Sequence, residues 1–144
     1  MSTVQEILAR KGDAVHSIDV NARVLDAARR MNDLGIGGLI VIEDEVAVGM
    51  FTERDILRRV VAAQLDPATT RIADVMTTPI AVCRPDTTVA ECRSVMTERR
   101  IRHLPIVDGD QVRGIVTIGD MLAHELGEYE TTIQYLNSYV FEGR

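Results

Sequence analysis

Short apolar runs flank acidic turns at two places along the chain. The runs are 39–42 and 46–51 around Glu43-Asp44-Glu45, and 104–107 and 112–116 around Asp108-Gly109-Asp110. Apolar runs of this length on either side of a tight polar turn are typical of β-hairpins, and Asp-Gly tolerates the positive φ that such turns need. The pattern therefore predicts two hairpins.

An amphipathic helix is predicted before each hairpin and another after it. Asn21 can cap the first, whose apolar face holds Val24, Ala28, Met31 and Leu34, and Thr88 can cap its counterpart with Glu91 in the capping-box position. The later helices begin near Asp55 and Asp120, and an extended piece at 15–20 opens the first unit. Each unit thus has the order strand, helix, strand, strand, helix.

The two units are copies of one repeat. An offset of 65 residues aligns Gly49 with Gly114, and it pairs residues 16–59 with 81–124 without a gap. Pro67 and its polar neighbours place the boundary near residues 65–71. Because a small sheet cannot bury both faces alone, the repeats are expected to pack sheet to sheet with pseudo-two-fold symmetry, in a mixed α/β (α+β) fold. The predicted division is 1–66 with an N-terminal helix and 67–144 with an extended C-terminal helix, together one module.

Two further segments lie outside the repeats. Thr3 and Glu6 form a capping-box pattern before Val4, Ile7 and Leu8, which predicts an N-terminal helix that covers an edge of the pair. Toward the C-terminus, apolar residues recur at intervals of three and four, at Leu122, Leu126, Tyr129, Ile133, Leu136 and Val140. This seam is a dimer contact or packs on the protein's own surface.

A polar motif recurs where the last strand of each repeat meets a helix. It is Thr52-x-x-Asp55 in the first repeat and Thr117-x-x-Asp120 in the second. A helix N-terminus presents unpaired N–H groups, a threonine hydroxyl can donate to a phosphate oxygen, and a carboxylate can accept from both hydroxyls of a ribose. The motif suits a nucleotide, although both aspartates could merely cap their helices.

These residues resemble CBS domains, the module named after cystathionine β-synthase, and the chain resembles a stand-alone CBS pair, or Bateman module, over residues 4–126. The resemblance rests on Ile36-Gly37-Gly38-Leu39-Ile40-Val41-Ile42 with Gly49-Met50-Phe51-Thr52-Glu53-Arg54-Asp55, and on Ile101-Arg102-His103-Leu104-Pro105-Ile106-Val107-Asp108 with Gly114-Ile115-Val116-Thr117-Ile118-Gly119-Asp120. It implies regulation without catalysis, by AMP, ADP, ATP, NAD(H) or S-adenosylmethionine held in clefts between the repeats.

The resemblance also implies roles in a second-repeat site. Asp120 would hold the ribose and Thr117 the phosphate, with Ile118 and Gly119 around the sugar. Ile80 and Ala81 would bind adenine through their main chain, Ile101 and Leu104 would sandwich it, and Arg102 and His103 would reach the phosphates. Arg99 and Arg100 extend this cationic cluster, or form a solvated helix end.

The first repeat departs from the second at several positions of the implied site. Thr52 and Asp55 keep their roles, Leu39 matches Leu104, and Val15 and His16 lie near the base. Gly37 and Gly38, however, stand where the second repeat has Arg102 and His103, and Glu53 and Arg54 replace Ile118 and Gly119. Two hypotheses follow. Arg54 supplies the missing positive charge, or the glycines make room for a dinucleotide.

Composition narrows the function further. The chain has 46% hydrophobic residues, a net charge of −6 and neither a long apolar run nor a secretory pattern at Met1, so we expect a cytoplasmic protein that binds neither membrane nor nucleic acid. Cys83 and Cys92 have no metal-ligand spacing and are expected to be buried thiols. No catalytic motif or metal site is found, which predicts a protein that is not an enzyme and has no catalytic cofactor.

The expected function is therefore a nucleotide sensor that forms a homodimer and signals to an effector protein not named by the sequence. Two alternatives remain open. An NAD(H) or S-adenosylmethionine sensor would use the same clefts, and a ligand-free scaffold would use only the paired sheets and the C-terminal helix. Threonine and aspartate in both repeats argue against the scaffold.

Overall fold

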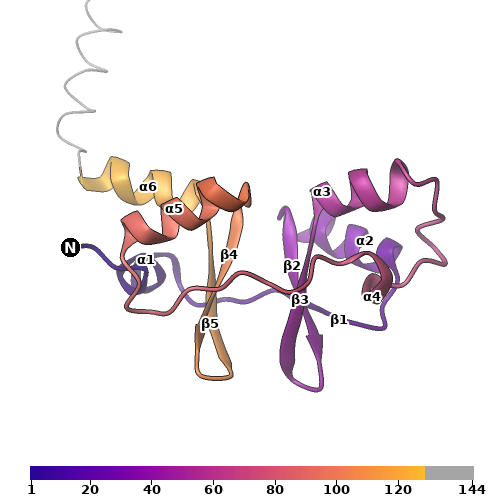
Figure 1. Cartoon of the computed structure of the whole chain (residues 1–144), viewed down its shortest axis with the longest axis horizontal. Helices are drawn as coiled ribbons and strands as arrows, with labels where there is room; N and C mark the ends of the chain where they lie inside the picture. The colour runs from indigo at the N-terminus through magenta and orange to yellow at the C-terminus, as the bar shows by residue number, and fades with distance from the viewer. Residues whose placement is uncertain (129–144) are drawn as a thin grey trace, which may run out of the picture.

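Strands and helices follow the predicted order in the first repeat, and in the second they do so except for the opening strand. The computed structural model describes residues 1–128 (Figure 1). The helices are α1 (Val4–Lys11), α2 (Val24–Leu34), α3 (Glu53–Asp55), α4 (Ile72–Val75), α5 (Val89–Arg99) and α6 (Ile118–Glu128), with the π-helix η1 (Ile56–Val61) directly after α3. The strands are β1 (Ser17–Asp19), β2 (Gly38–Glu43), β3 (Val46–Thr52), β4 (His103–Asp108) and β5 (Gln111–Thr117). Both predicted hairpins are confirmed.

The two sheets differ by one strand. In the first repeat β1 runs parallel to β2, and β2 pairs antiparallel with β3. In the second, β4 and β5 form a two-stranded sheet, and the counterpart of β1 is reduced to a single parallel bridge between Cys83 and Ile106. Val20, which donates to Ile42 at 3.0 Å, corresponds to Pro85, and proline has no N–H to extend the ladder. The third strand therefore ends there.

The sheets pack face to face, as predicted. Ile40 and Met50 of the first sheet and Ile115 of the second form one buried cluster, with Ile80 and Val112 against it. Each repeat has a further core between its sheet and its helices. In Figure 1 the two hairpins stand side by side and point the same way, with the helices toward the opposite end. Polar groups that follow β3 and precede β4 are thereby brought to one place.

The helix that precedes each repeat packs on the other repeat. Ile7 of α1 is buried in the core of the second repeat, whereas Ile72 of α4 is buried in the core of the first. These residues are 65 positions apart and so occupy equivalent places. The N-terminal helix does cover the pair, but it does so on the second repeat. This exchange brings the end of α1 near α6 and the segment after α4 near α3.

Helix starts follow the predictions only in part. Thr88 caps α5, because its hydroxyl accepts from the Glu91 N–H at 3.1 Å. Asn21 does not cap α2, which starts after Arg23; its side-chain oxygen instead accepts from Arg71 of the linker at 2.6 Å. That prediction was wrong because the helix begins two residues later than Asn21 would require.

The capping box predicted at Thr3 was also wrong. Thr3 precedes α1, but its side chain makes no capping hydrogen bond. Its backbone forms an antiparallel bridge with Thr88 instead, and the Val89 N–H donates to Ser2 at 2.9 Å. Pairing with the start of α5 fixes this segment in place of a cap.

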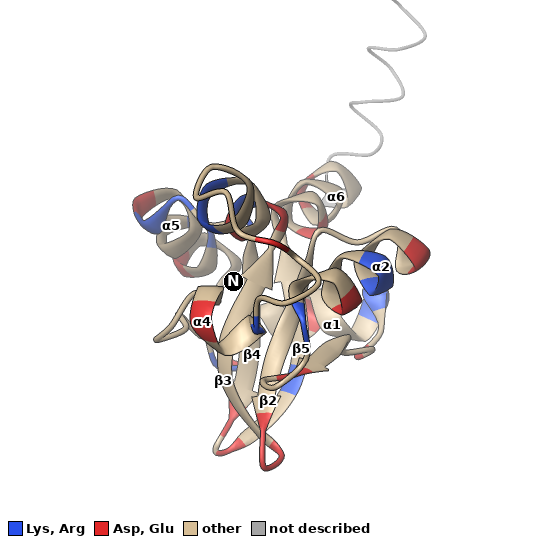
Figure 2. Cartoon of the chain, turned by 90° about the vertical axis from the view of Figure 1, so that its right-hand side faces the viewer, with Lys and Arg blue, Asp and Glu red and all other residues tan. Residues whose placement is uncertain are grey.

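Charge is unevenly spread over the molecule. Figure 2 shows acidic residues at the tips of both hairpins, where Asp44 and Asp110 are exposed. No helix in the described part is both long and apolar enough to span a bilayer. The opposite ends of the strands, next to α3 and α5, carry the arginines described below.

Candidate functional site: a cleft between the repeats

The first Thr-x-x-Asp motif forms a reciprocal cap at the start of α3. The Thr52 hydroxyl accepts from the Asp55 N–H at 3.4 Å, and the Thr52 N–H donates to Asp55 Oδ2 at 3.0 Å. Threonine is therefore the cap and aspartate the third helical residue, so the helix begins at Glu53 and not at Asp55. Asp55 therefore does take part in capping, but as the third residue of a capping box and not as the cap residue itself.

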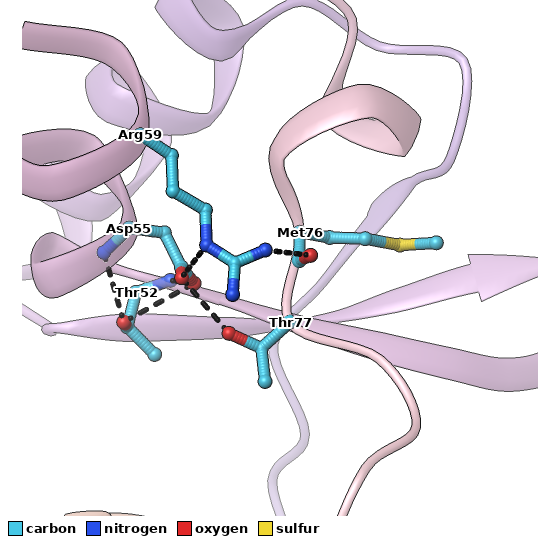
Figure 3. A network of polar contacts seen from close by, with 5 residues as sticks. All are labelled: Thr52, Asp55, Arg59, Met76 and Thr77. Atoms are coloured by element: carbon cyan, nitrogen blue, oxygen red, sulfur yellow. Dashed lines mark hydrogen bonds and ion pairs between the residues drawn. The ribbon is translucent and has the colours of Figure 1, made fainter. Parts of the chain in front are cut away.

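Asp55 has two further side-chain partners, Arg59 from the next helical turn and Thr77 from the segment after α4 (Figure 3). The Thr77 hydroxyl donates to Oδ1 at 2.8 Å, and Arg59 Nε lies 3.6 Å from the same oxygen. Arg59 also donates to the Met76 carbonyl at 2.9 Å. Asp55 is only 5% exposed, and a buried carboxylate is costly unless it is hydrogen-bonded. The network therefore joins the start of α3 to the segment after α4.

A cleft of about 810 Å³ opens beside Asp55, within the roughly 300–1,000 Å³ usual for small-molecule sites. We call it the inter-repeat cleft, because its walls come from both repeats and the linker. It is lined by Gly37, Met50, Thr52, Glu53, Arg54, Asp55, Leu57, Arg58, Thr77, Pro79, Ile80, Ala81, Arg99, Arg100, Ile101, Arg102 and His103. Apolar residues form part of this wall, and charged residues together with Thr52 and Thr77 form most of the rest.

Positive charge dominates the inter-repeat cleft. Five arginines and two carboxylates line it. Arg54 Nη1 donates to the Arg100 carbonyl at 2.6 Å and so bridges the two repeats. Arg100 has φ +56°, a conformation that glycine tolerates better, and Gly35 holds the equivalent place in the first repeat with φ +65°. A strained arginine at the cleft is a functional indication.

His103 lies where the two repeats meet. A Cβ on Gly38 would come within 3.3 Å of its ring, and one on Gly37 within 3.5 Å. The space that these glycines leave is therefore filled by His103. Burial is the main cause that lowers the pKa of His103, and the positive charges of Lys11 and Arg102 lower it further. The negative charges of Glu53 and Asp120 act in the opposite direction. The ring thus faces charged groups from both Thr-x-x-Asp elements.

The second Thr-x-x-Asp motif repeats the cap but has a different partner. The Thr117 N–H donates to Asp120 Oδ2 at 2.8 Å, and the Thr117 hydroxyl accepts from the Asp120 N–H at 3.1 Å. Lys11 Nζ, at the end of α1, lies 2.5 Å from the same Oδ2 and donates to the Ile115 carbonyl at 2.7 Å. We call Thr117, Asp120 and Lys11 the Asp120 site.

Comparison with known proteins identifies the repeat. The model of the CBS domain matches residues 4–62 and 72–127. The chain belongs to the CBS domain family. CBS pairs are regulatory modules, and proteins that contain them often bind small molecules and form oligomers.

Relatives and solved structures agree with this assignment. The chain is 28% identical over 151 residues to the mitochondrial CBS domain-containing protein CBSX3 of Arabidopsis thaliana, covering 99% of this chain and 73% of the relative. It is 31% identical over 126 residues to the CBS domain-containing protein YhcV of Bacillus subtilis, covering 88% and 87%. A CBS-domain structure from Burkholderia ambifaria, 34% identical, superposes with a TM-score of 0.84 over 88% of this chain and 95% of that one.

In this CBS pair, the residues predicted for two separate sites are distributed differently. The inter-repeat cleft takes residues from both predicted groups: Gly37, Thr52, Glu53, Arg54 and Asp55 from the first, and Ile80, Ala81, Ile101, Arg102 and His103 from the second. Thr117, Ile118, Gly119 and Asp120 lie at the start of α6 and are not among its lining residues. One cleft therefore joins the first motif to the cations of the second repeat.

The remaining predicted residues lie in cores or beside the sheets. Leu39 and Leu104 are fully buried in the cores of their own repeats. Val15 packs against the cluster between the sheets, and the His16 carbonyl accepts from the Ile40 N–H at 3.1 Å. Gly38 lies against the His103 ring and the Thr52 methyl group. None of these residues lines the inter-repeat cleft.

Several cleft residues were not among those predicted. Met50, Leu57, Arg58, Thr77 and Pro79 line the cleft without having been proposed. Arg58 follows Asp55 by nearly one turn, a spacing that could have identified it. Thr77 gives no such signal, because its place beside Asp55 depends on the linker packing back on the first repeat.

The cysteines behave as expected for the described residues. Cys83 and Cys92 are buried and free, and a hydrogen bond to Cys83, with burial, raises the pKa of Cys92. Within residues 1–128 no group of three or more histidine, cysteine or acidic side chains could hold a metal ion.

Proposed function

We propose that this CBS pair is a non-catalytic sensor that binds an adenosine-containing nucleotide in the inter-repeat cleft. The observation that carries the proposal is the composition of this one cleft. It combines the Thr52-x-x-Asp55 helix start, five arginines and an apolar wall that includes Met50, Ile80 and Ile101. A nucleotide needs these three surfaces together, for its ribose, its phosphates and its base.

Each part of the ligand has a partner of suitable chemistry. The ribose hydroxyls would donate to Asp55, and the adenine would lie between apolar side chains near Ile80 and Ala81. The phosphates would meet Arg102 and Arg54, whose planar guanidinium groups match phosphate oxygens in two-point hydrogen bonds. Arg54 thus supplies the positive charge that Gly37 and Gly38 cannot.

The charge of the cleft favours AMP, ADP or ATP over S-adenosylmethionine. Five arginines against two carboxylates attract phosphate and repel a sulfonium cation. NAD(H) also carries phosphate groups and is the alternative. The His103 ring fills the space beside Gly37 and Gly38, which removes the specific reason to prefer a dinucleotide there.

A ligand in this cleft would act by holding the repeats in one arrangement. The walls come from both repeats, so a bound nucleotide contacts both at once. Regulation requires that the nucleotide bind one arrangement more tightly than another, because equal affinity would shift nothing. An effector protein would then recognise the favoured arrangement.

Isothermal calorimetry with AMP, ATP, NADH and S-adenosylmethionine tests the proposal. The wild type should bind a phosphate-bearing ligand, and Arg102→Ala should lose at least about tenfold in affinity, because a hydrogen bond between two charged groups is lost. Arg84→Ala is the matched control, since Arg84 is exposed and pairs with Asp86 outside the cleft. Equal affinity of the two variants, or preference for S-adenosylmethionine, would contradict the proposal.

We further propose that the protein forms a homodimer through the helices that follow each hairpin. Leu57 and Val61 of η1 are 62% and 61% exposed, and Leu122 and Leu126 of α6 are 56% and 52% exposed. These pairs are 65 positions apart, and Figure 1 shows their helices at the same end of the molecule. Two equivalent apolar stripes suit a two-fold interface, in which the same surface contacts itself.

Analytical ultracentrifugation of Leu57→Glu and Leu122→Glu tests the dimer. Each substitution would bury a glutamate charge in the dimer interface, so each variant should be a monomer with an unchanged helical circular dichroism signal. Val46→Glu, on the exposed end of β3, is the control and should leave the dimer intact. The remaining seam residues, from Tyr129 to Val140, lie outside the described residues.

The reducing cytoplasm is the proposed location of the protein, because Cys83 and Cys92 are both free thiols.

A further inference from the structure

The Asp120 site contains a lysine from outside the repeat. Lys11 is the last residue of α1, yet its ammonium group contacts Asp120 and the Ile115 carbonyl. The helix is held against the second repeat at two more points: Leu8 packs so closely on Gly114 that a Cβ there would be 2.7 Å from it, and Arg10 donates to His124 at 2.8 Å. The position of Lys11 is thus fixed by the docking of the whole helix.

The equivalent place in the first repeat has no such cation. Met76 stands 65 positions after Lys11, and the residue after it, Thr77, reaches Asp55 with a neutral hydroxyl. Arg59 also approaches Asp55, but it belongs to the same helical segment and does not line the cleft. Within the inter-repeat cleft, the partners of Asp55 are therefore threonine hydroxyls.

This difference changes what a ribose would have to displace. On Asp55, a ribose hydroxyl can take the place of a threonine hydroxyl as hydrogen-bond donor, so that one neutral donor replaces another. On Asp120 it would replace an ammonium group, and a hydrogen bond between two charged groups is about twice as strong as a neutral one. Removal of Lys11 would also leave the Ile115 carbonyl without that donor.

We propose that Lys11 determines which of the two repeated motifs receives the nucleotide, by closing the Asp120 site. The inference rests on the proposed function. The inter-repeat cleft then binds one nucleotide per chain, while the Asp120 site stays closed as long as α1 remains docked. A ligand that entered the Asp120 site would have to draw the end of α1 away.

Calorimetric stoichiometry with ATP and AMP tests this proposal. The wild type should bind one nucleotide per chain, and Lys11→Met, which keeps the length of the side chain but removes its charge, should bind two. Adding Asp120→Ala to Lys11→Met should return the stoichiometry to one. Lys11→Arg keeps the cation and should remain at one. Arg113→Met is the control, since it removes an equal charge from an exposed ion pair with Asp108 in the same repeat.

The outcomes separate this inference from the proposed function. One site in both the wild type and Lys11→Met, or two sites in the wild type, would overturn closure by Lys11 and leave nucleotide binding standing. Binding by Lys11→Met alone would support closure and overturn the assignment to the inter-repeat cleft. No binding by either protein would overturn both. Circular dichroism establishes that each variant is folded. If the Lys11→Met protein does not fold, Lys11→Gln takes its place in the measurement.

Discussion

The two Thr-x-x-Asp elements have the same backbone cap and different surroundings. Both threonines accept from the aspartate N–H, and both aspartates accept in return. Asp55 is buried and is contacted by the half-buried Thr77 and the exposed Arg59, whereas the Asp120 side chain is 22% exposed and paired with Lys11. The repeat preserves local geometry. Thr77 and Lys11 come from the segments before the repeats, and these segments have diverged.

The exchange of helices explains why the surroundings differ. α1 packs on the second repeat and α4 on the first. The last residue of α1, Lys11, contacts Asp120, and Thr77, shortly after α4, contacts Asp55. Arg59 and His124 are equivalent positions, but Arg59 approaches Asp55 while His124 pairs with Arg10 of α1. Small changes in these two short segments are therefore enough to make one motif part of a cleft and to close the other.

The largest contrast is expected from removal of the two aspartates. Asp55→Ala should lower the free energy of unfolding by about 3 kcal/mol, because a buried carboxylate loses its hydrogen bonds to the half-buried Thr52 and Thr77. Asp120→Ala should cost less, about 1–2 kcal/mol, the usual loss on removing a cap together with the loss of the partly exposed ion pair with Lys11. Urea unfolding of both variants measures the difference. Equal losses would mean that Thr77 and Arg59 stabilise Asp55 no more than Lys11 stabilises Asp120.

The two aligned glycines should differ next. A Cβ on Gly49 would lie 2.9 Å from the Thr77 carbonyl, which is backbone, so Gly49→Ala should cost about 1–3 kcal/mol. A Cβ on Gly114 would meet only the end of the Leu8 side chain, which can move. Gly114→Ala should therefore lower the free energy of unfolding by less than Gly49→Ala does. Thermal or urea unfolding of both variants measures the difference. The reverse order would show that α1 is docked more rigidly than the linker.

Arg100 and Gly35 offer a matched exchange at the end of equivalent helices. Arg100→Gly should stabilise the protein by about 1 kcal/mol, because it relieves the left-handed conformation, and should weaken nucleotide binding. Gly35→Ala should lower the free energy of unfolding by a similar amount, because its φ of +65° is unfavourable for alanine. No atom lies within 4 Å of the new Cβ, so the loss would come from the backbone conformation alone. Urea unfolding and calorimetry test the pair. Destabilisation by Arg100→Gly would show that the arginine contributes to the fold.

The smallest effect concerns His103, which faces both elements. Its pKa is lowered in the folded protein, so the unfolded chain binds the proton more tightly. The free energy of unfolding should therefore be unaffected above the usual histidine pKa of about 6.5 and should fall as the pH drops below it. Urea unfolding between pH 5 and 8 should show a shallower fall for His103→Gln. An identical pH profile for the wild type and His103→Gln would mean that other groups cause the loss of stability at acidic pH.

The sequence predicted the elements well because their signals are local. The hairpins at 39–51 and 104–116 are set by short apolar runs on either side of a tight turn, and the cap of α5 is set by Thr88 and Glu91 three residues apart. Predictions that depended on distant partners fared worse. Asn21 pairs with Arg71, and Thr3 with Thr88, because the linker and the N-terminus pack back on the repeats.

For the site, the residue types could be predicted but not their grouping. The Thr-x-x-Asp motifs and the cationic cluster at Arg99–His103 are visible as a repeat and as a run of charge. That Arg102 shares a cleft with Asp55, and that Lys11 rather than a ligand-facing hydroxyl meets Asp120, follows from packing across the pseudo-two-fold interface.

The sequence by itself determined the repeated unit, its core-facing positions and its two polar motifs, because helix caps, turns and apolar periodicity act over a few residues. Only the tertiary structure decided which cation lies beside which carboxylate. Such contacts join residues that are 109 positions apart, as in Lys11 and Asp120, and their formation depends on how whole helices dock on sheets. No local pattern encodes that docking.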